Sequence, residues 1–139
     1  MKKRILIIGG HDPSGGAGVM MDANICRLNE CHPLTLITAE TVQNSQRSKD
    51  NFPANEKVFK KQLDFILEDI KPDAIKIGML FSEKNVIAVV RSLDKIKVKK
   101  IVLDPVMVST SGFRLISKKC IDSIRFKLMK RVNLITPNI

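Results

Sequence analysis

A glycine-rich loop near the amino terminus carries the clearest signal for chemistry in this sequence. An apolar run at 5–8 leads into the loop, which reads Gly9-Gly10-His11-Asp12-Pro13-Ser14-Gly15-Gly16-Ala17-Gly18, and a helical pattern begins near Val19. An α/β fold uses this order to bring a ligand against backbone amides at a helix start. No Lys-Ser/Thr pair follows the glycines and the spacing is not G-x-G-x-x-G, so neither common nucleotide loop is matched. The loop therefore predicts a small polar ligand without identifying it.

Short strands and helices alternate along the chain and would position this loop. Apolar, mostly β-branched runs predict buried strands at 5–8, 34–38, 74–77, 101–103 and 133–136. Helical spacing predicts helices over 58–70, over 86–93 after an N-cap at Ser82, and over 120–129 after Ser117. This alternation indicates an α/β fold, with a parallel sheet covered by helices on both faces and a single domain over 1–139.

Composition restricts the class of protein further. The 139 residues are 44% hydrophobic and 27% charged, which is typical of one soluble globular domain. The apolar run before the glycines is too short for a signal peptide or a membrane span, so we expect a cytoplasmic protein. Three cysteines without repeated spacing predict free thiols. Cys26, Cys31 and His32 lack the second ligand pair of a zinc site, so we expect no metal there.

The chain is strongly basic, with 24 Lys and Arg against 14 Asp and Glu and a formal charge of +10. This charge has two interpretations, a solvated lysine surface or a nucleic-acid footprint. The absence of Trp and Tyr and the presence of only six Phe leave few platforms for base stacking, so we expect no nucleic-acid partner. A basic field also attracts phosphorylated small molecules.

In a parallel α/β sheet, ligands bind outside the carboxyl ends of the strands. Every predicted end carries a glycine, a carboxylate or an amide, at 9–12, 38–44, 78–79, 104–107 and 137–138. Gly, Pro and Asn mark strand ends in any fold, so one such end carries little weight. All of them together predict one polar site at this edge of the sheet.

These motifs, in chain order, resemble the hydroxymethylpyrimidine and hydroxymethylpyrimidine-phosphate kinases of thiamine biosynthesis, members of the ribokinase-like superfamily. The resemblance spans the chain through Gly10, Asp12-Pro13-Ser14-Gly15-Gly16-Ala17-Gly18 with Asp22, Ile37-Thr38-Ala39 with Gln43-Asn44, Lys76-Ile77-Gly78-Met79-Leu80, Leu103-Asp104-Pro105-Val106-Met107 with Ser111-Gly112, and Ile135-Thr136-Pro137-Asn138. Each motif is modest alone, whereas all of them in register are specific. The sequence departs from these kinases at Glu40, usually apolar, and at Phe113, usually aspartate.

The resemblance implies ATP- and Mg²⁺-dependent phosphorylation of 4-amino-5-hydroxymethyl-2-methylpyrimidine and then of its monophosphate. It assigns the pyrimidine pocket to Gly10, Ala17, Asp22, Gln43, Met79 and Val106, and the phosphate and Mg²⁺ region to Asp104 and Asn138. The residue types support part of this assignment, because the Gln43 amide complements an aminopyrimidine edge and Met79 and Val106 supply apolar faces. The resemblance also implies a homodimer, and from the short apolar run at 5–8 we expect no membrane partner.

The resemblance covers the N-terminal part of a ribokinase-like kinase, about half of its length. It implies that the catalytic residue and the glycine-rich anion hole lie beyond Ile139, so we expect no catalytic residue within 1–139. The chain alone is then expected to be inactive and only marginally stable. Two alternatives stay open, a related kinase acting on pyridoxine-type rings and a non-catalytic ligand-binding remnant.

Lys76 is unexpected because it interrupts the apolar strand predicted at 74–77. Burial of an ammonium without a partner is costly, so Lys76 should face solvent from an edge strand or lie beside a carboxylate. We favour a carboxylate near the strand ends, with Asp104 and Asp12 as the candidates.

Overall fold

A mixed sheet in the order β3-β2-β1-β4-β5-β6 forms the centre of the protein. The computed structural model describes residues 2–107 and 116–137. The strands are β1 (Arg4–His11), β2 (His32–Gln43), β3 (Ser48–Pro53), β4 (Ala74–Ile77), β5 (Ile101–Leu103) and β6 (Leu134–Ile135). All neighbouring strands pair in parallel except β2 and β3, which are antiparallel. The predicted α/β fold is confirmed, and the expected purely parallel sheet gains one antiparallel edge strand.

The edge strand β3 is absent from the sequence prediction because its residues are mostly polar and exposed. It forms because β2 continues past the predicted end at 38 and pairs with it from Ala39 to Gln43. The Asn44 side chain nucleates the connecting turn by accepting hydrogen bonds from the backbone N–H groups of Gln46 and Arg47. The hairpin extends β2 so that Gln43 stands beyond the body of the sheet.

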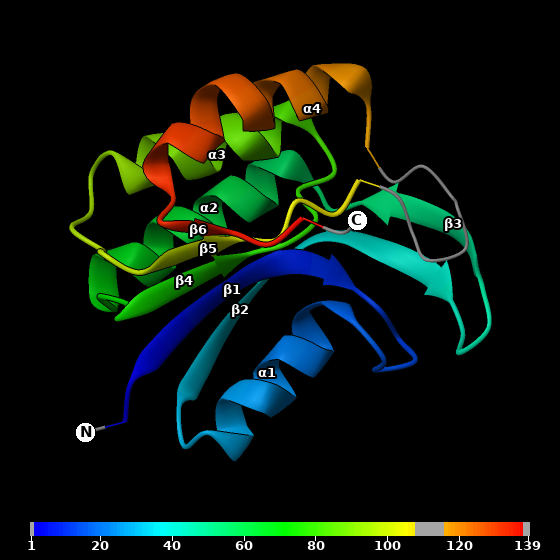
Figure 1. The fold of residues 1–139 in the computed structure, drawn as a ribbon, viewed down its shortest axis with the longest axis horizontal. Helices are drawn as coiled ribbons and strands as arrows, with labels where there is room; N and C mark the ends of the chain where they lie inside the picture. Colours follow the sequence, from blue (N-terminus) through cyan, green and yellow to red (C-terminus); the bar gives the residue numbers. More distant parts are fainter. Residues whose placement is uncertain (1, 108–115, 138–139) are drawn as a thin grey trace.

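Helices cover both faces of the sheet, as predicted. Helix α1 (Gly18–Leu28) lies on one face, and α2 (Glu56–Asp69), α3 (Glu83–Leu93) and α4 (Lys118–Ser123) lie on the other (Figure 1). Ser82 and Ser117 cap α3 and α4 by accepting hydrogen bonds from backbone N–H groups. The helix predicted over 120–129 is divided instead, because α4 gives way to a π-helical segment at Ile124–Leu128 and a 3₁₀ turn at Met129–Arg131.

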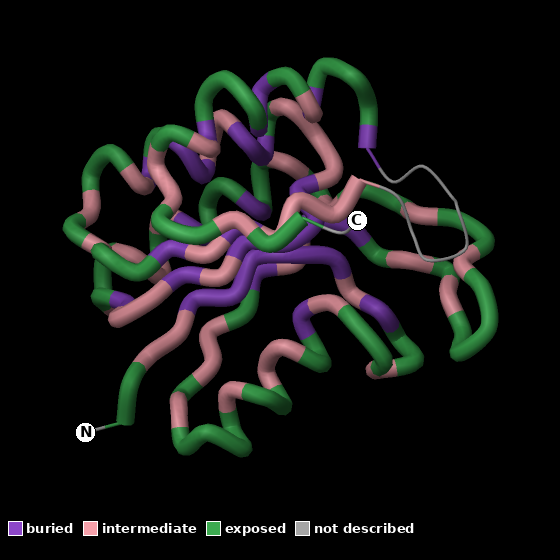
Figure 2. The backbone as a smooth tube through the Cα atoms, in the orientation of Figure 1, coloured by how far each residue is buried: buried purple, intermediate pink, exposed green. Residues whose placement is uncertain are grey.

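The main core lies between the sheet and α2, α3 and α4. Figure 2 shows burial concentrated along the central strands, and the core includes Leu6, Ile8, Ile75 and Ile77 from the sheet with Phe59, Leu63, Val86 and Val89 from the helices. Strand β4 lies between β1 and β5. Lys76 therefore belongs to a central strand, and the edge-strand interpretation of this residue is wrong.

None of the helices within residues 2–107 and 116–137 is long and apolar enough to cross a bilayer.

Candidate functional site

The strand ends converge on a cavity of about 160 Å³ at the carboxyl edge of the sheet. Residues from β1, the glycine-rich loop, α1, β2, β4 and the segment after β5 line it together. Its lining includes all six residues that the resemblance assigns to the pyrimidine, namely Gly10, Ala17, Asp22, Gln43, Met79 and Val106, and also Asp104. Asn138 lies outside the described residues. The topology thus brings residues that are far apart in the sequence to one site.

Two glycines allow the loop and its neighbours to approach each other closely. Gly18 has a φ of +62°, and a Cβ there would lie 2.3 Å from the carbonyl oxygen of Gly10. A Cβ on Gly10 would lie 2.5 Å from the Cε atom of Met79. A side chain at either position would therefore displace the loop or the Met79 wall of the cavity.

The first turn of α1 begins beside the cavity without a side-chain cap. Its N-cap residue Ala17 offers no cap hydrogen bond, whereas Asn55 caps α2 and Ser82 caps α3. Ala17 and Gly18 both line the cavity. The uncapped N–H groups can therefore be satisfied by a polar or anionic ligand atom.

The apolar wall at Met79 is held by a set of buried hydrogen bonds. The Thr38 hydroxyl donates to the Met79 carbonyl at 2.6 Å, and the Asn85 side-chain amide donates to the Leu80 carbonyl at 2.9 Å. The Gly78 N–H donates to the Ile8 carbonyl at 2.7 Å. The backbone of residues 78–80 is therefore held by three neighbouring elements, and Met79 lines the cavity together with Val106.

Asp12 is a buried carboxylate that joins the loop to β2. Its Oδ1 atom accepts hydrogen bonds from the Ser14 backbone N–H at 2.8 Å and from the Ser14 hydroxyl at 2.7 Å. Its Oδ2 atom accepts a hydrogen bond from Gln43 Nε2 at 3.2 Å. The expectation that Asp12 pairs with Lys76 is wrong, because Asp12 is turned toward its own loop and Gln43.

Lys76 does find carboxylate partners near the strand ends, as predicted. Its Nζ atom lies 2.6 Å from Asp22 Oδ2 and 3.7 Å from Asp104 Oδ2. The predicted partner Asp104 is confirmed, and Asp22 is the nearer one. Asp22 was not predicted in this role, because no local pattern indicates that a side chain of α1 reaches Lys76 on β4. We call Lys76, Asp22 and Asp104 the carboxyl-edge cluster.

The rim of the cavity contains residues that the sequence analysis did not select. The Thr41 hydroxyl donates to the His11 carbonyl at 2.9 Å, and His11 Nδ1 lies 2.5 Å from Glu40 Oε2. Alternation along β2 could have indicated Thr41, because it lies two residues before Gln43 and shares its face. The pairing of Glu40 with His11 explains why a carboxylate can stand at this usually apolar position.

The site can supply oxygen ligands to a cation only sparingly. Within the described ranges, no group of three or more His, Cys, Asp or Glu side chains is arranged to hold a metal ion. Mg²⁺ often uses one or two carboxylates together with substrate phosphates and water. Asp104 fits that kind of binding as a single carboxylate ligand.

The fold and the site define an α/β protein with a small, partly apolar cavity at the carboxyl edge of its sheet. The family model described as phosphomethylpyrimidine kinase matches residues 12–139. The chain therefore belongs to the phosphomethylpyrimidine kinase family.

Curated relatives agree with this family. The chain is 38% identical over 134 residues to the hydroxymethylpyrimidine/phosphomethylpyrimidine kinase of Aquifex aeolicus, covering 96% of this chain and 52% of the relative. It is 36% identical over 139 residues to the Escherichia coli protein of the same name, covering 99% and 52%. The chain thus spans about half the length of the curated relatives it matches.

Solved structures share the fold. A crystal structure of phosphomethylpyrimidine kinase from Clostridium difficile matches with a TM-score of 0.90 at 37% identity, covering 99% of this chain and 60% of that one. The pyridoxal kinase of Staphylococcus aureus in complex with pyridoxal matches with a TM-score of 0.88 at 29% identity, covering 99% and 51%. The ribokinase-like expectation is confirmed for this part of the fold.

Proposed function

We propose that this protein phosphorylates the hydroxymethyl group of 4-amino-5-hydroxymethyl-2-methylpyrimidine, and then its monophosphate, with ATP as the phosphoryl donor. The observation that carries the proposal is one cavity that combines the Gln43 amide with the apolar side chains of Met79 and Val106. An amide pairs with an aminopyrimidine edge as it does with adenine, and the apolar side chains suit the faces of the ring. The names of the relatives support the same activity.

The residues of the cavity would bind and orient the substrate. Gln43 would pair with the ring edge, and the uncapped start of α1 would receive a polar or anionic group of the ligand. Asp104 would contribute an oxygen ligand to Mg²⁺, and Asn138 is proposed for the same region. When bound, Mg²⁺ supplies positive charge to the phosphoryl oxygens. Binding of an ATP analogue by the S. aureus pyridoxal kinase supports the proposed nucleotide.

A pyridoxine-type substrate is the second candidate. It is favoured by the structural match to the S. aureus pyridoxal kinase in complex with pyridoxal. Titration with the aminopyrimidine and with pyridoxal separates the two, because we expect the pyrimidine to bind more tightly. Tighter binding of pyridoxal would replace the first proposal with the second.

The direct test replaces Gln43 by leucine in the full-length protein. Gln43→Leu leaves a polar ring edge unpaired and should cost about 1–3 kcal/mol in pyrimidine binding. Gln46→Leu is a matched control, because Gln46 lies exposed in the turn after β2. Calorimetry should show weaker binding for Gln43→Leu and wild-type binding for Gln46→Leu. Equal affinity in both variants would remove Gln43 from the site.

We also propose where the protein is located and how it assembles. We propose a cytoplasmic location because Cys26, Cys31 and Cys120 are free thiols, which persist in a reducing compartment. The resemblance implies a homodimer, and light scattering of the purified protein would measure its oligomeric state.

A further inference from the structure

The contact between Asp12 and Gln43 determines which atoms of the Gln43 amide remain available to a ligand. Asp12 is 4% exposed, and its Oδ2 atom accepts the hydrogen bond from Gln43 Nε2. A carboxylate can only accept hydrogen bonds, so the amide must turn its nitrogen toward Asp12. The carbonyl oxygen Oε1 and the second N–H are left for other partners.

Asp12 is itself held in one orientation by the glycine-rich loop. Its other oxygen, Oδ1, accepts from the backbone N–H and the hydroxyl of Ser14. A backbone N–H is always a donor, so the Ser14 N–H requires an acceptor. A side-chain amide, in contrast, can turn by 180° and so exchange its oxygen acceptor for its nitrogen donor. The loop therefore fixes Asp12, and Asp12 in turn fixes Gln43.

We propose that Asp12 is a positioning residue that sets the ring preference of the site by holding the Gln43 amide in one orientation. The amide then matches a ring edge that presents an N–H donor beside a ring-nitrogen acceptor, as a 4-aminopyrimidine does. The 4-oxo analogue of that ring presents a carbonyl beside a ring N–H, which reverses the pattern. This inference rests on the proposed function, because it places Gln43 against the ring.

The two rings are nearly equal in size and differ at one edge, so shape alone separates them poorly. An amide free to turn would pair with either ring, because rotation by 180° exchanges its oxygen and its nitrogen. An amide held by a carboxylate pairs well with only one of them. The ratio of the two binding affinities therefore shows whether a neighbouring group holds the Gln43 amide in one orientation.

Asp12→Asn should reverse the Gln43 amide while keeping the shape of the side chain at position 12. The oxygen of the substituted side chain must face the Ser14 backbone donor, which turns its nitrogen toward Gln43. Two amide nitrogens cannot hydrogen-bond to each other as donors, so Gln43 should turn its oxygen toward position 12. The pocket would then be offered an N–H where the wild type offers Oε1.

The experiment titrates the full-length protein with 4-amino-5-hydroxymethyl-2-methylpyrimidine and with its 4-oxo analogue. The wild type should favour the amino ring by about fivefold or more, since a mismatched polar edge costs at least about 1 kcal/mol. Asp12→Asn should shift the ratio of the two affinities by about tenfold or more toward the oxo ring. The ratio is informative because general damage to the loop would weaken both rings alike.

Ser14→Ala is the matched control for Asp12→Asn. It removes one donor to Asp12 but keeps the carboxylate, so the wild-type ratio should persist.

Several results would overturn the inference. Equal binding of both rings by the wild type, which needs no variant to fold, contradicts it directly. An unchanged ratio in Asp12→Asn also contradicts it. If the wild type binds neither ring, the proposed function itself fails. If it binds the amino ring and the ratio never responds to position 12, only the positioning role of Asp12 fails.

Discussion

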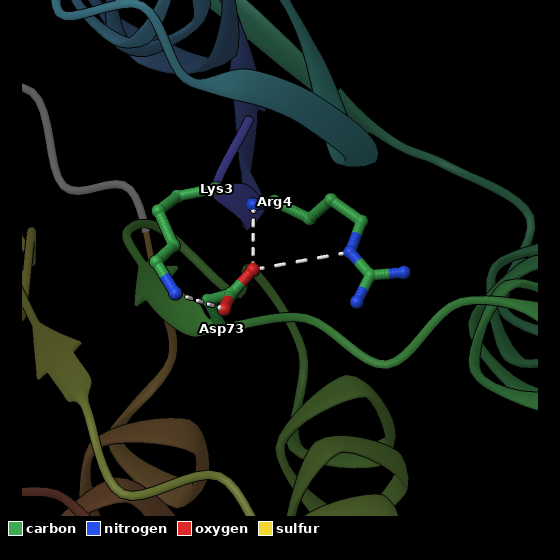
Figure 3. A network of polar contacts seen from close by, with 3 residues as sticks. All are labelled: Lys3, Arg4 and Asp73. Atoms are coloured by element: carbon green, nitrogen blue, oxygen red, sulfur yellow. Dashed lines mark hydrogen bonds and ion pairs between the residues drawn. The ribbon is translucent and has the colours of Figure 1, made fainter. Parts of the chain in front are cut away.

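Two charged clusters beside β4 show how position in the sheet separates structural ion pairs from those of the site. At the amino end, Asp73 accepts hydrogen bonds from Lys3 Nζ at 3.0 Å and from the Arg4 backbone N–H at 2.8 Å, and lies 3.8 Å from Arg4 Nε (Figure 3). Toward the carboxyl end of β4, Lys76 forms the carboxyl-edge cluster with Asp22 and Asp104. One cluster joins two bases to an acid, and the other joins two acids to a base.

Their surroundings differ more than their composition. The Lys3 side chain is 72% exposed, whereas the Lys76 side chain is 26% exposed and lines the cavity. Exposed pairs are screened by water and contribute little to stability. A partly desolvated cluster that joins α1, β4 and the segment after β5 transmits any change to the ligand site. We therefore expect charges near the carboxyl ends of the strands to affect ligand binding, and charges at the amino ends to leave it unchanged.

The largest effect is expected from Gly18→Ala, which disturbs the loop on which the carboxyl-edge site depends. An alanine at position 18 would have to adopt a left-handed backbone conformation, and its Cβ would contact the Gly10 carbonyl oxygen. We expect these two effects together to cost more than about 2 kcal/mol in stability and to abolish pyrimidine binding. Gly15→Ala is the control, because Gly15 has a φ of +74° but open space around its Cβ position. Denaturant unfolding and calorimetry should separate the two variants. Equal losses would show that the contact with Gly10 is unimportant.

Lys76→Met should have the next largest effect. It leaves Asp22 and Asp104 without their cation, and we expect a loss of about 1–3 kcal/mol in pyrimidine binding, less than for a fully buried pair because the cluster is partly exposed. Asp22 is the nearer partner, so ring binding should weaken along with turnover. Lys3→Met is the matched control at the amino-end cluster and should leave affinity unchanged. Equal affinities in both variants would erase the distinction between the clusters.

We expect the smallest effect from Asp73→Asn, which should lower stability slightly and leave pyrimidine affinity unchanged. The hydrogen bond from the Arg4 backbone N–H, followed by that from Lys3, lowers the pKa of Asp73 below its ordinary value of 3.8. A lowered folded-state pKa stabilises the protein above the unfolded-state pKa, and this contribution is lost as the pH falls through the folded-state pKa. Thermal unfolding should therefore show a slightly lower Tm than the wild type at pH 7. The difference should vanish in acid, and a difference that grew there would contradict this assignment.

The sequence predicted the elements better where they are apolar and periodic. Strand β4 matches its predicted range, and Ser82 caps α3 as expected. Strand β3 was missed because its stability comes from pairing with β2 rather than from an apolar pattern. The same limit applied to the site. The strand ends predicted where the polar residues gather and that Asp104 pairs with Lys76. The nearer partner, Asp22, was not predicted, because it depends on how α1 packs and no local pattern contains that packing.

The central claim is that the carboxyl edge of the sheet binds an aminopyrimidine through Gln43. The most direct measurement is a crystal structure of the full-length protein with 4-amino-5-hydroxymethyl-2-methylpyrimidine. We predict that the ring contacts Met79 and Val106 and that its exocyclic amine lies within about 3.2 Å of Gln43 Oε1. A ring bound elsewhere, or one in this cavity with its amine turned away from Gln43, would contradict the claim.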